Sequence, residues 1–170
     1  YAYTEDHMDG LALVARVDLF SEVGSIDENY FAYGEEIDLE KRGAAAGYRR
    51  MRTNVPIWHY SSGTFGTVPL MASYLAIRNQ IRLAIKHEGV GGVVRRVLAL
   101  YNTACVPFLD FDADSKVVNR RRPRNIFFNF FIFTYCLLWN LVYLRSTLRR
   151  RREDYAKVRE SGAGSETDRD

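Results

Sequence analysis

The chain has 170 residues, of which 47% are hydrophobic, and its formal net charge is +3 at pH 7. This length and composition indicate one globular core with extensions and argue against several domains. The two cysteines, Cys105 and Cys136, lie in apolar runs without CxxC spacing, which argues against a disulfide framework and indicates a reducing compartment. The N-terminal residues lack a signal-peptide pattern and an initiator Met, so we expect a fragment.

The positive charge is concentrated in one part of the chain. Between Lys116 and Arg152 there are ten basic residues and no acidic one. Such a cluster indicates an anionic partner, either a lipid surface or a nucleic acid. Because these residues bracket an apolar run instead of an aromatic-studded groove, we expect lipid and no nucleic acid.

The N-terminal half is expected to combine short strands and helices. Residues 11–20 predict a strand that passes into a helix at Val17–Val23. A second helix is expected from Glu35 to about Ala46, with Arg42 on its solvent-facing side. Two short strands are expected to follow, at 48–53 and 55–60.

The C-terminal half is expected to be helical. Apolar spacing predicts helices over 71–86 and about 93–108, separated by a glycine-rich break. Residues 126–144 form an uncharged run of nearly the roughly 20 residues that span a bilayer core. Basic residues flank this run on both sides, so a spanning helix, an interfacial helix and a helix packed on the core all remain open.

These patterns divide the chain into four parts. The expected divisions are a catalytic-base and acceptor region at 1–88, an amphipathic helix and linker at 89–115, a basic-flanked membrane helix at 116–152, and a charged, disordered or frayed helical tail at 153–170.

Several polar side chains are candidates for chemistry. Glu35 and Glu36 begin a predicted helix, where the dipole favours ionised carboxylates that either cap the helix or act as a general base. Asp38 and Arg42 have the spacing of a structural ion pair on one helix face. His59 ends an apolar strand and is either a metal ligand or a hydrogen-bonded strand end.

The order of these residues resembles the C-terminal half of the family-2 glycosyltransferases, inverting enzymes of GT-A fold, and in particular their rhamnosyltransferase-like members. The similarity covers about residues 10–86. The matching positions are Val23-Gly24, Asp27-Glu28, Tyr30-Phe31, Tyr33-Gly34-Glu35-Glu36-Ile37-Asp38-Leu39, Arg42, Gly47-Tyr48, Trp58-His59, Ser62-Gly63-Thr64, Tyr74 and Arg78-Asn79.

The resemblance implies roles for individual residues. Glu36 aligns with the general base, where the family more often has Asp, and Glu35 is the alternative base. His59 aligns with a histidine that joins the divalent metal in some members. Binding of the donor diphosphate is implied for Arg78, Ser62 and Thr64. Acceptor binding is implied for Asp27, Glu28, Tyr30 and Tyr33.

The resemblance also implies a fold, a cofactor and partners. We expect an α/β protein, the C-terminal half of a GT-A domain, that transfers sugar from a nucleotide-sugar to a glycan or lipid-linked acceptor in cell-envelope polysaccharide synthesis. Mg²⁺ or Mn²⁺ would be bound mainly by an N-terminal half carrying Asp-x-Asp. Asp112-Ala113-Asp114 has the Asp-x-Asp form, but it lies in an expected linker after the acceptor region. The chain therefore lacks most of the expected donor site, and we expect it to be inactive alone. The expected location is the cytoplasmic face of a membrane, and the alternative function is a non-catalytic membrane-associated scaffold.

Overall fold

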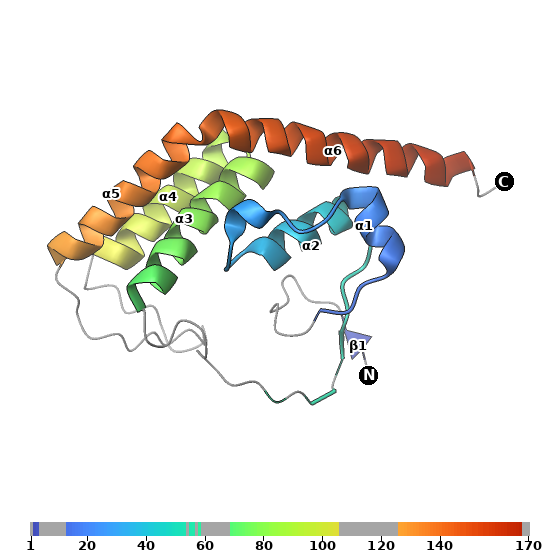
Figure 1. Ribbon diagram of the computed structural model, residues 1–170, viewed down its shortest axis with the longest axis horizontal. Coiled ribbons are helices and arrows are strands. Elements are labelled where there is room, and N and C mark those ends of the chain that lie inside the picture. Colours follow the sequence, from blue (N-terminus) through green and yellow to red (C-terminus); the bar gives the residue numbers. More distant parts are fainter. Residues whose placement is uncertain are drawn as a thin grey trace.

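The structure is a computed structural model that describes residues 2–3, 13–53, 55–56, 58, 69–105 and 126–167. Helices make up nearly all of its regular structure (Figure 1). The elements in chain order are β1 (Ala2–Tyr3), α1 (Val17–Val23), the 3₁₀ helix η1 (Glu28–Tyr30), α2 (Glu35–Ala45), β2 (Arg52–Thr53), α3 (Pro69–His87), α4 (Val90–Cys105), α5 (Ile126–Val142) and α6 (Leu144–Thr167).

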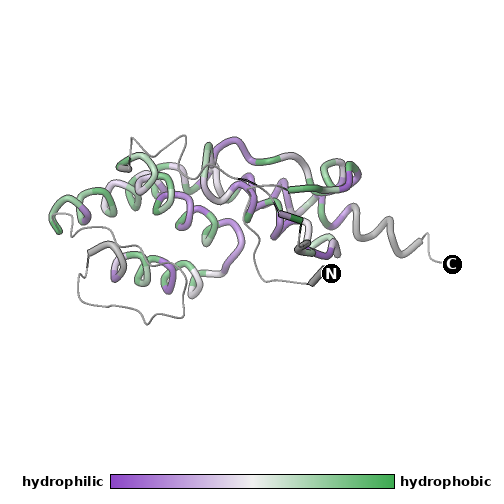
Figure 2. The backbone as a smooth tube through the Cα atoms, turned by 90° about the horizontal axis from the view of Figure 1, so that it is seen from below, coloured by the Kyte–Doolittle hydropathy of each residue, from purple (hydrophilic) through white to green (hydrophobic). Residues whose placement is uncertain are grey.

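Helices α3, α4 and α5 lie side by side and form one end of the molecule (Figure 1). Their buried contact is apolar and draws on all three helices, in agreement with the predicted apolar faces. Its buried members are Ile81, Leu100, Ile132, Phe133 and Cys136. Hydrophobic residues accordingly dominate this end of the backbone trace (Figure 2).

A second apolar cluster lies where α1 and α2 meet the C-terminal part of α6. Leu19 and Val23 from α1 pack with Leu39 from α2 and Val158 from α6. Helix α6 follows α5 after a bend of 61° and runs past α1 and α2 (Figure 1). It therefore contacts both ends of the molecule.

The α/β GT-A expectation is wrong for the part of the chain that the structure describes. Its strands are the two-residue β1 and β2, paired antiparallel with Ala2 opposite Thr53 and Tyr3 opposite Arg52. Residues 13–16, expected to be in a strand, precede α1 without regular structure. Leu13 and Val14 suit a strand but find no neighbouring strand among the described residues, and context decides β structure more than propensity does.

One further expectation needs correction. Arg42 does not face solvent, because its side chain is fully buried beneath α6. The charged tail from residue 153, expected to be disordered or a frayed helix, is helical as part of α6 up to Thr167. In the described ranges, no individual helix is both long and apolar enough to cross a bilayer, and α5 with α6 meets that criterion only as a bent pair.

Candidate functional site

Two side chains of α3, Arg78 and Asn79, form hydrogen bonds with the loop between α1 and α2. The Nδ2 group of Asn79 lies 2.9, 2.7 and 2.9 Å from the carbonyl oxygens of Tyr30, Ala32 and Tyr33. Arg78 donates from Nη2 to the Tyr30 carbonyl at 2.7 Å. These bonds satisfy loop carbonyls that have no partner in a helix or sheet, and so they fix the approach to α2.

This loop carries unusual backbone conformations. Phe31 and Tyr33 both have positive φ, 65° and 67°, which bulky L-residues rarely adopt. Gly34 follows at φ 106° and precedes the first turn of α2. Such conformations persist where the surrounding structure imposes them, and they often occur at functional sites. Here the bonds from Asn79 impose them.

Glu35 and Glu36 lie directly after the strained loop, in the first turn of α2. Both are partly buried, and Glu36 accepts the backbone N–H of Gly34 at Oε2, 3.1 Å away. Burial raises the pKa of Glu35, and the neighbouring Glu36 raises it further. Among the described residues, Oε2 of Glu35 has no hydrogen-bond partner. The pair therefore combines one carboxylate engaged with the backbone and one with a raised proton affinity.

A group of buried ionisable side chains lies next to the loop, and we call it the buried charge cluster. It joins the loop and α2 to α3 and α6, between the two apolar clusters. Its members are Asp27, Asp38, Arg42, Arg82, Lys86, His87 and Asp154.

Lys86 is the centre of the buried charge cluster. Its ammonium is fully buried and lies 3.1 Å from Asp27, 2.7 Å from Asp38 and 2.7 Å from Asp154. Arg42 pairs with Asp38 at 2.9 Å, as the i, i+4 spacing predicted, and it also donates to the carbonyls of the segment after α1. Three cations, counting Arg82, therefore balance three carboxylates in the interior, as buried charges require.

The pairing sets the protonation of the cluster. Burial on its own raises the pKa of Asp38, but the bond from His87 and the charges of Lys86 and Arg42 outweigh it and lower the pKa to about 2. Burial likewise opposes ionisation of Asp27, yet its partners hold the pKa of that carboxyl well below its usual range. Burial lowers the pKa of His87, so its ring is neutral at pH 7.

The three carboxylates of the cluster could suggest a metal site, since their oxygens lie within 4.8 Å of one another. The Lys86 ammonium, however, contacts all three and has the position that a shared cation would take. With Arg42 and Arg82 also present, the negative charge is already balanced. This donor set does not fit a divalent ion, and the predicted Mg²⁺ or Mn²⁺ stays a prediction.

The structure separates the residues predicted to bind an acceptor. Asp27 and Tyr30 are buried, with Asp27 paired to Lys86 and the Tyr30 hydroxyl 3.3 Å from Asp38. Their observed contacts are structural, and acceptor binding by Asp27 and Tyr30 stays a prediction. Glu28 and Tyr33 are exposed, so acceptor binding by these two stays a prediction.

The predicted donor side is described only in part. Arg78 is buried, bonded to the loop carbonyls and stacked 4.6 Å from the ring of Trp139. Its observed contacts are structural, and donor binding by Arg78 stays a prediction. His59, Ser62 and Thr64 lie outside the described residues.

Sequence reasoning missed most of the buried charge cluster. Lys86, Arg82 and His87 lie on a helix whose apolar face alone was recognised, and Asp154 lies in a segment expected to be a charged tail. The spacing of Arg82 and Lys86, four apart on one helix face, was an available signal. That spacing did not identify their partners. Asp27, which both residues bind, lies 55 positions before Arg82 and 59 before Lys86.

Comparison with known proteins adds one relationship. Over 86 residues, 48% of this chain, the sequence is 34% identical to the N-acetylglucosaminyl-diphospho-decaprenol L-rhamnosyltransferase of Mycobacterium tuberculosis, in strains CDC 1551 and H37Rv alike. The chain is related to a glycosyltransferase. It spans about a quarter, 27%, of the length of these relatives. No protein-family model and no solved structure matches the chain.

Proposed function

We propose that this chain is the acceptor-side part of a glycosyltransferase that moves a sugar from a nucleotide-sugar donor to a hydroxyl of a lipid-linked acceptor. The observation that carries the proposal is its 34% identity to the mycobacterial rhamnosyltransferase. The geometry adds a pair of carboxylates, Glu35 and Glu36, in the first turn of α2, directly after a loop that α3 holds in a fixed conformation. A fixed loop suits a site in which the acceptor hydroxyl must be aligned for attack.

The proposed reaction is one displacement with inversion. A carboxylate accepts the proton of the acceptor hydroxyl while that oxygen forms a bond to the anomeric carbon. The bond between the anomeric carbon and the nucleoside diphosphate breaks at the same time, and the diphosphate leaves with the bonding electron pair. General-base assistance of this kind contributes about 10²–10⁴-fold to the rate.

Glu36 is the first candidate for the base because the family resemblance aligns it with that role. Glu35 is the second candidate, because its raised pKa makes it the better proton acceptor and its Oε2 has no bond partner among the described residues. Glu36 holds the Gly34 N–H, so a division of roles between a positioning carboxylate and a free base would favour Glu35, whereas the family resemblance favours Glu36.

The test uses the complete protein with a panel of nucleotide-sugars and an N-acetylglucosaminyl-diphospho-lipid acceptor. We expect Glu36→Gln or Glu35→Gln to lower kcat by about 100-fold or more, while the exposed Glu160→Gln on α6 leaves it unchanged. The acidic limb of the pH–rate profile reports protonation of the base. It should persist in the control and vanish in the base variant. Near-wild-type transfer by both variants would exclude this pair as the base.

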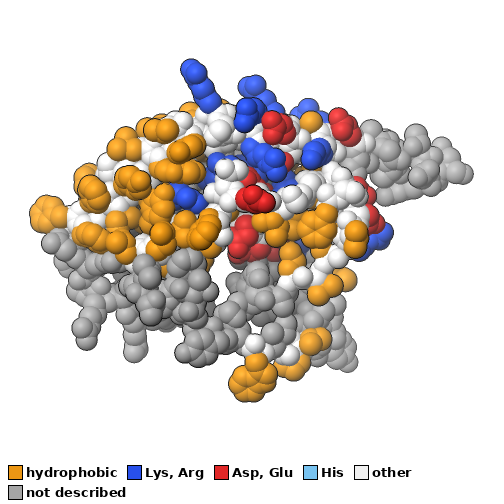
Figure 3. All heavy atoms as spheres, viewed as in Figure 1, with side chains coloured by type: hydrophobic (Ala, Val, Ile, Leu, Met, Phe, Trp, Pro, Cys, Tyr) orange, Lys and Arg blue, Asp and Glu red, His pale blue; other side chains and the backbone are white. Residues whose placement is uncertain are grey.

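We also propose that the chain lies on a membrane surface. One face of α5 exposes large apolar side chains, among them Phe127 and Phe131, and the adjacent α4 exposes Val94 and Leu98 (Figure 3). Arg145, at the start of α6, is exposed next to this apolar face. An apolar face bordered by cations matches a bilayer with anionic headgroups.

Sedimentation with phosphatidylglycerol-containing vesicles tests this attachment. The double variant Phe127→Ser, Phe131→Ser should lose binding, whereas Phe20→Ser on α1, away from the face, should retain it. Release of the wild-type protein from membranes by carbonate would support surface attachment. Resistance to carbonate would instead support a spanning arrangement of α5 and α6.

A further inference from the structure

A polar pocket lies where η1, α3 and the first turns of α6 meet. Its volume is about 170 Å³, enough for a phosphate or diphosphate group. It lies outside the buried charge cluster but shares Arg82 with it. The lining residues are Asn29, Arg82, Ser146, Arg149, Arg150 and Glu153.

Arg82 is the fixed element of the pocket. Its side chain is only 2% exposed, and it is held by Thr147 through Nη1 at 2.7 Å and by Asp27 through Nη2 at 3.2 Å. Its Nε is buried and has no hydrogen-bond partner among the described residues. Buried donors are nearly always paired in native proteins, so a guanidinium in this state indicates an acceptor that the described residues do not supply.

The rest of the pocket is adjustable and positively charged. Arg149 is 78% exposed and can turn toward a ligand, whereas Arg150 is 35% exposed and lies 3.3 Å from the buried Asp154. The pocket contains one carboxylate, Glu153, which lies 3.6 Å from Arg149 and 4.0 Å from Arg150. Because Arg82 is already balanced by the carboxylates of the buried charge cluster, Arg149 and Arg150 against Glu153 leave an excess of one positive charge. Glu153 therefore competes with any bound anion for the same two arginines.

We propose that this pocket binds a phosphate group of a lipid. Guanidiniums form paired hydrogen bonds with phosphate oxygens, and the Asn29 amide, which donates one hydrogen bond to Asp27, has a second N–H to offer. The Ser146 hydroxyl already donates to the Tyr143 carbonyl at 2.8 Å. The pocket begins three residues beyond Tyr143, where α5 ends its apolar run and α6 turns away. The proposal places the apolar chain of that lipid along the exposed face of α5.

Two lipids carry this chemistry: a lipid-linked diphosphate, and an anionic phospholipid of the bilayer. The inference does not depend on sugar transfer, so its test measures binding alone. We would titrate the complete protein with inorganic pyrophosphate by calorimetry at fixed ionic strength, and separately measure its binding to phosphatidylcholine vesicles with and without phosphatidylglycerol.

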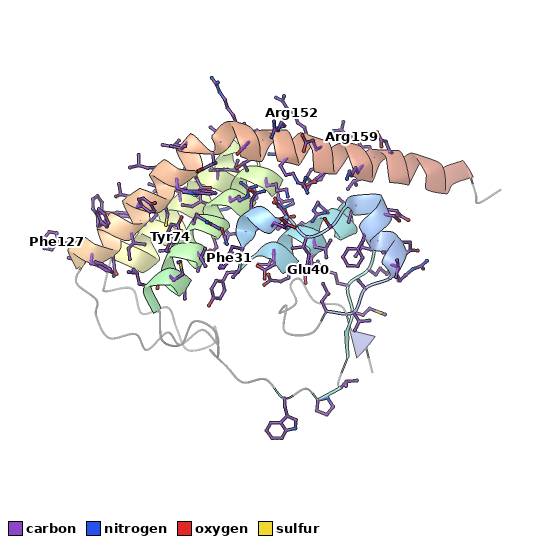
Figure 4. The ribbon with its side chains drawn as sticks, viewed as in Figure 1. Phe31, Glu40, Tyr74, Phe127, Arg152 and Arg159 are labelled. Carbon is purple, nitrogen blue, oxygen red and sulfur yellow. The ribbon has the colours of Figure 1, made fainter. Side chains whose placement is uncertain are left out.

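Arg149→Gln should weaken the binding of pyrophosphate, or of phosphatidylglycerol vesicles, by about tenfold. Arg152→Gln is the matched control, because Arg152 lies on the same helix, is exposed and points away from the body of the molecule (Figure 4). It removes the same charge and should change affinity by less than about twofold. Glu153→Gln should tighten binding by about threefold or more, because it removes the competing carboxylate.

The pyrophosphate titration and the vesicle measurement together identify which lipid supplies the phosphate. Pyrophosphate binding that depends on Arg149 assigns the pocket to a diphosphate, and vesicle binding alone with the same dependence assigns it to a bilayer lipid. Equal effects of Arg149→Gln and Arg152→Gln, or no tightening by Glu153→Gln, would mean that only general electrostatic attraction operates and would overturn the proposal.

Discussion

The ammonium of Lys86 lies 2.7 Å from the carboxylate of Asp154, which joins the last turn of α3 to the middle of α6 inside the protein. Neither side chain is exposed to solvent by more than 2%. Lys86 also binds Asp27 and Asp38, so one cation connects four segments of the chain. The arrangement of the loop, α2 and α6 around α3 therefore depends on this residue.

Lys86→Met keeps the length of the side chain and removes its charge, which leaves three buried carboxylates with two cations. Breaking a buried ion pair from one side destabilises a protein by about 3–5 kcal/mol, and we expect a loss in that range. Urea unfolding followed by circular dichroism measures it. Lys41→Met, on the partly exposed side of α2, should change the free energy of unfolding by less than about 0.5 kcal/mol. Equal effects would contradict a structural role for Lys86.

Stability should fall in acid because of Asp38. Its pKa is lowered to about 2 in the folded protein, below the ordinary value of 3.8, so the folded state binds fewer protons than the unfolded state. The stabilisation, about 2 kcal/mol, is complete above the unfolded pKa and is lost as the pH falls toward 2. Unfolding free energies measured from pH 6 to pH 2 should slope upward with pH, and Asp38→Asn should flatten the slope below pH 4.

Gly34→Ala should distort the entry to α2. The position has φ 106°, and an added Cβ would lie 3.0 Å from Cδ1 of Leu83. We expect a loss of about 1–3 kcal/mol in unfolding free energy. Gly47→Ala is the control, because Gly47 also has positive φ but an added Cβ would meet no atom within 4 Å. A thermal melt in which both variants lose equally would show that backbone strain alone matters and the contact with Leu83 does not.

Asn79→Ala should release the strained loop without unfolding the helices. It removes the donor that lies within 2.9 Å of three loop carbonyls, and an unsatisfied buried group costs about 1–3 kcal/mol. Amide hydrogen exchange of residues 29–34 should accelerate by about tenfold or more, while exchange in α3 and α5 stays slow. The exposed neighbour Gln80→Ala should leave the loop protected. Unchanged exchange in Asn79→Ala would refute the anchoring role.

Local patterns predicted the local features of this fold. The apolar period identified α3, and the helices expected at Val17–Val23 and from Glu35 to about Ala46 are α1 and α2. The pairing of Asp38 with Arg42 followed from their i, i+4 spacing. Each of these features depends on residues that are close in the chain, which is where sequence patterns carry most information.

The features that sequence did not predict depend on distant residues. Asp27, Lys86 and Asp154 are brought together only by tertiary packing, and nothing in their local composition indicates burial. The α/β expectation failed because 13–16 and 48–51 have strand-forming residues without partner strands in the described part of the chain. A charged segment such as the start of α6 and a short apolar segment such as 13–16 are each ambiguous until their neighbours are known.

The inward face of α6 carries mostly polar side chains at the spacing of a buried stripe, namely Thr147, Arg151, Asp154 and Val158. Because each added residue turns a helix by about 100°, inserting one alanine after Ser146 would rotate this stripe out of register with its partners, provided that the upstream helices stay in place. Inserting seven would return it close to its original phase. Homologues should therefore tolerate substitutions on the outer side of α6 far more readily than an inserted or deleted residue between Thr147 and Val158.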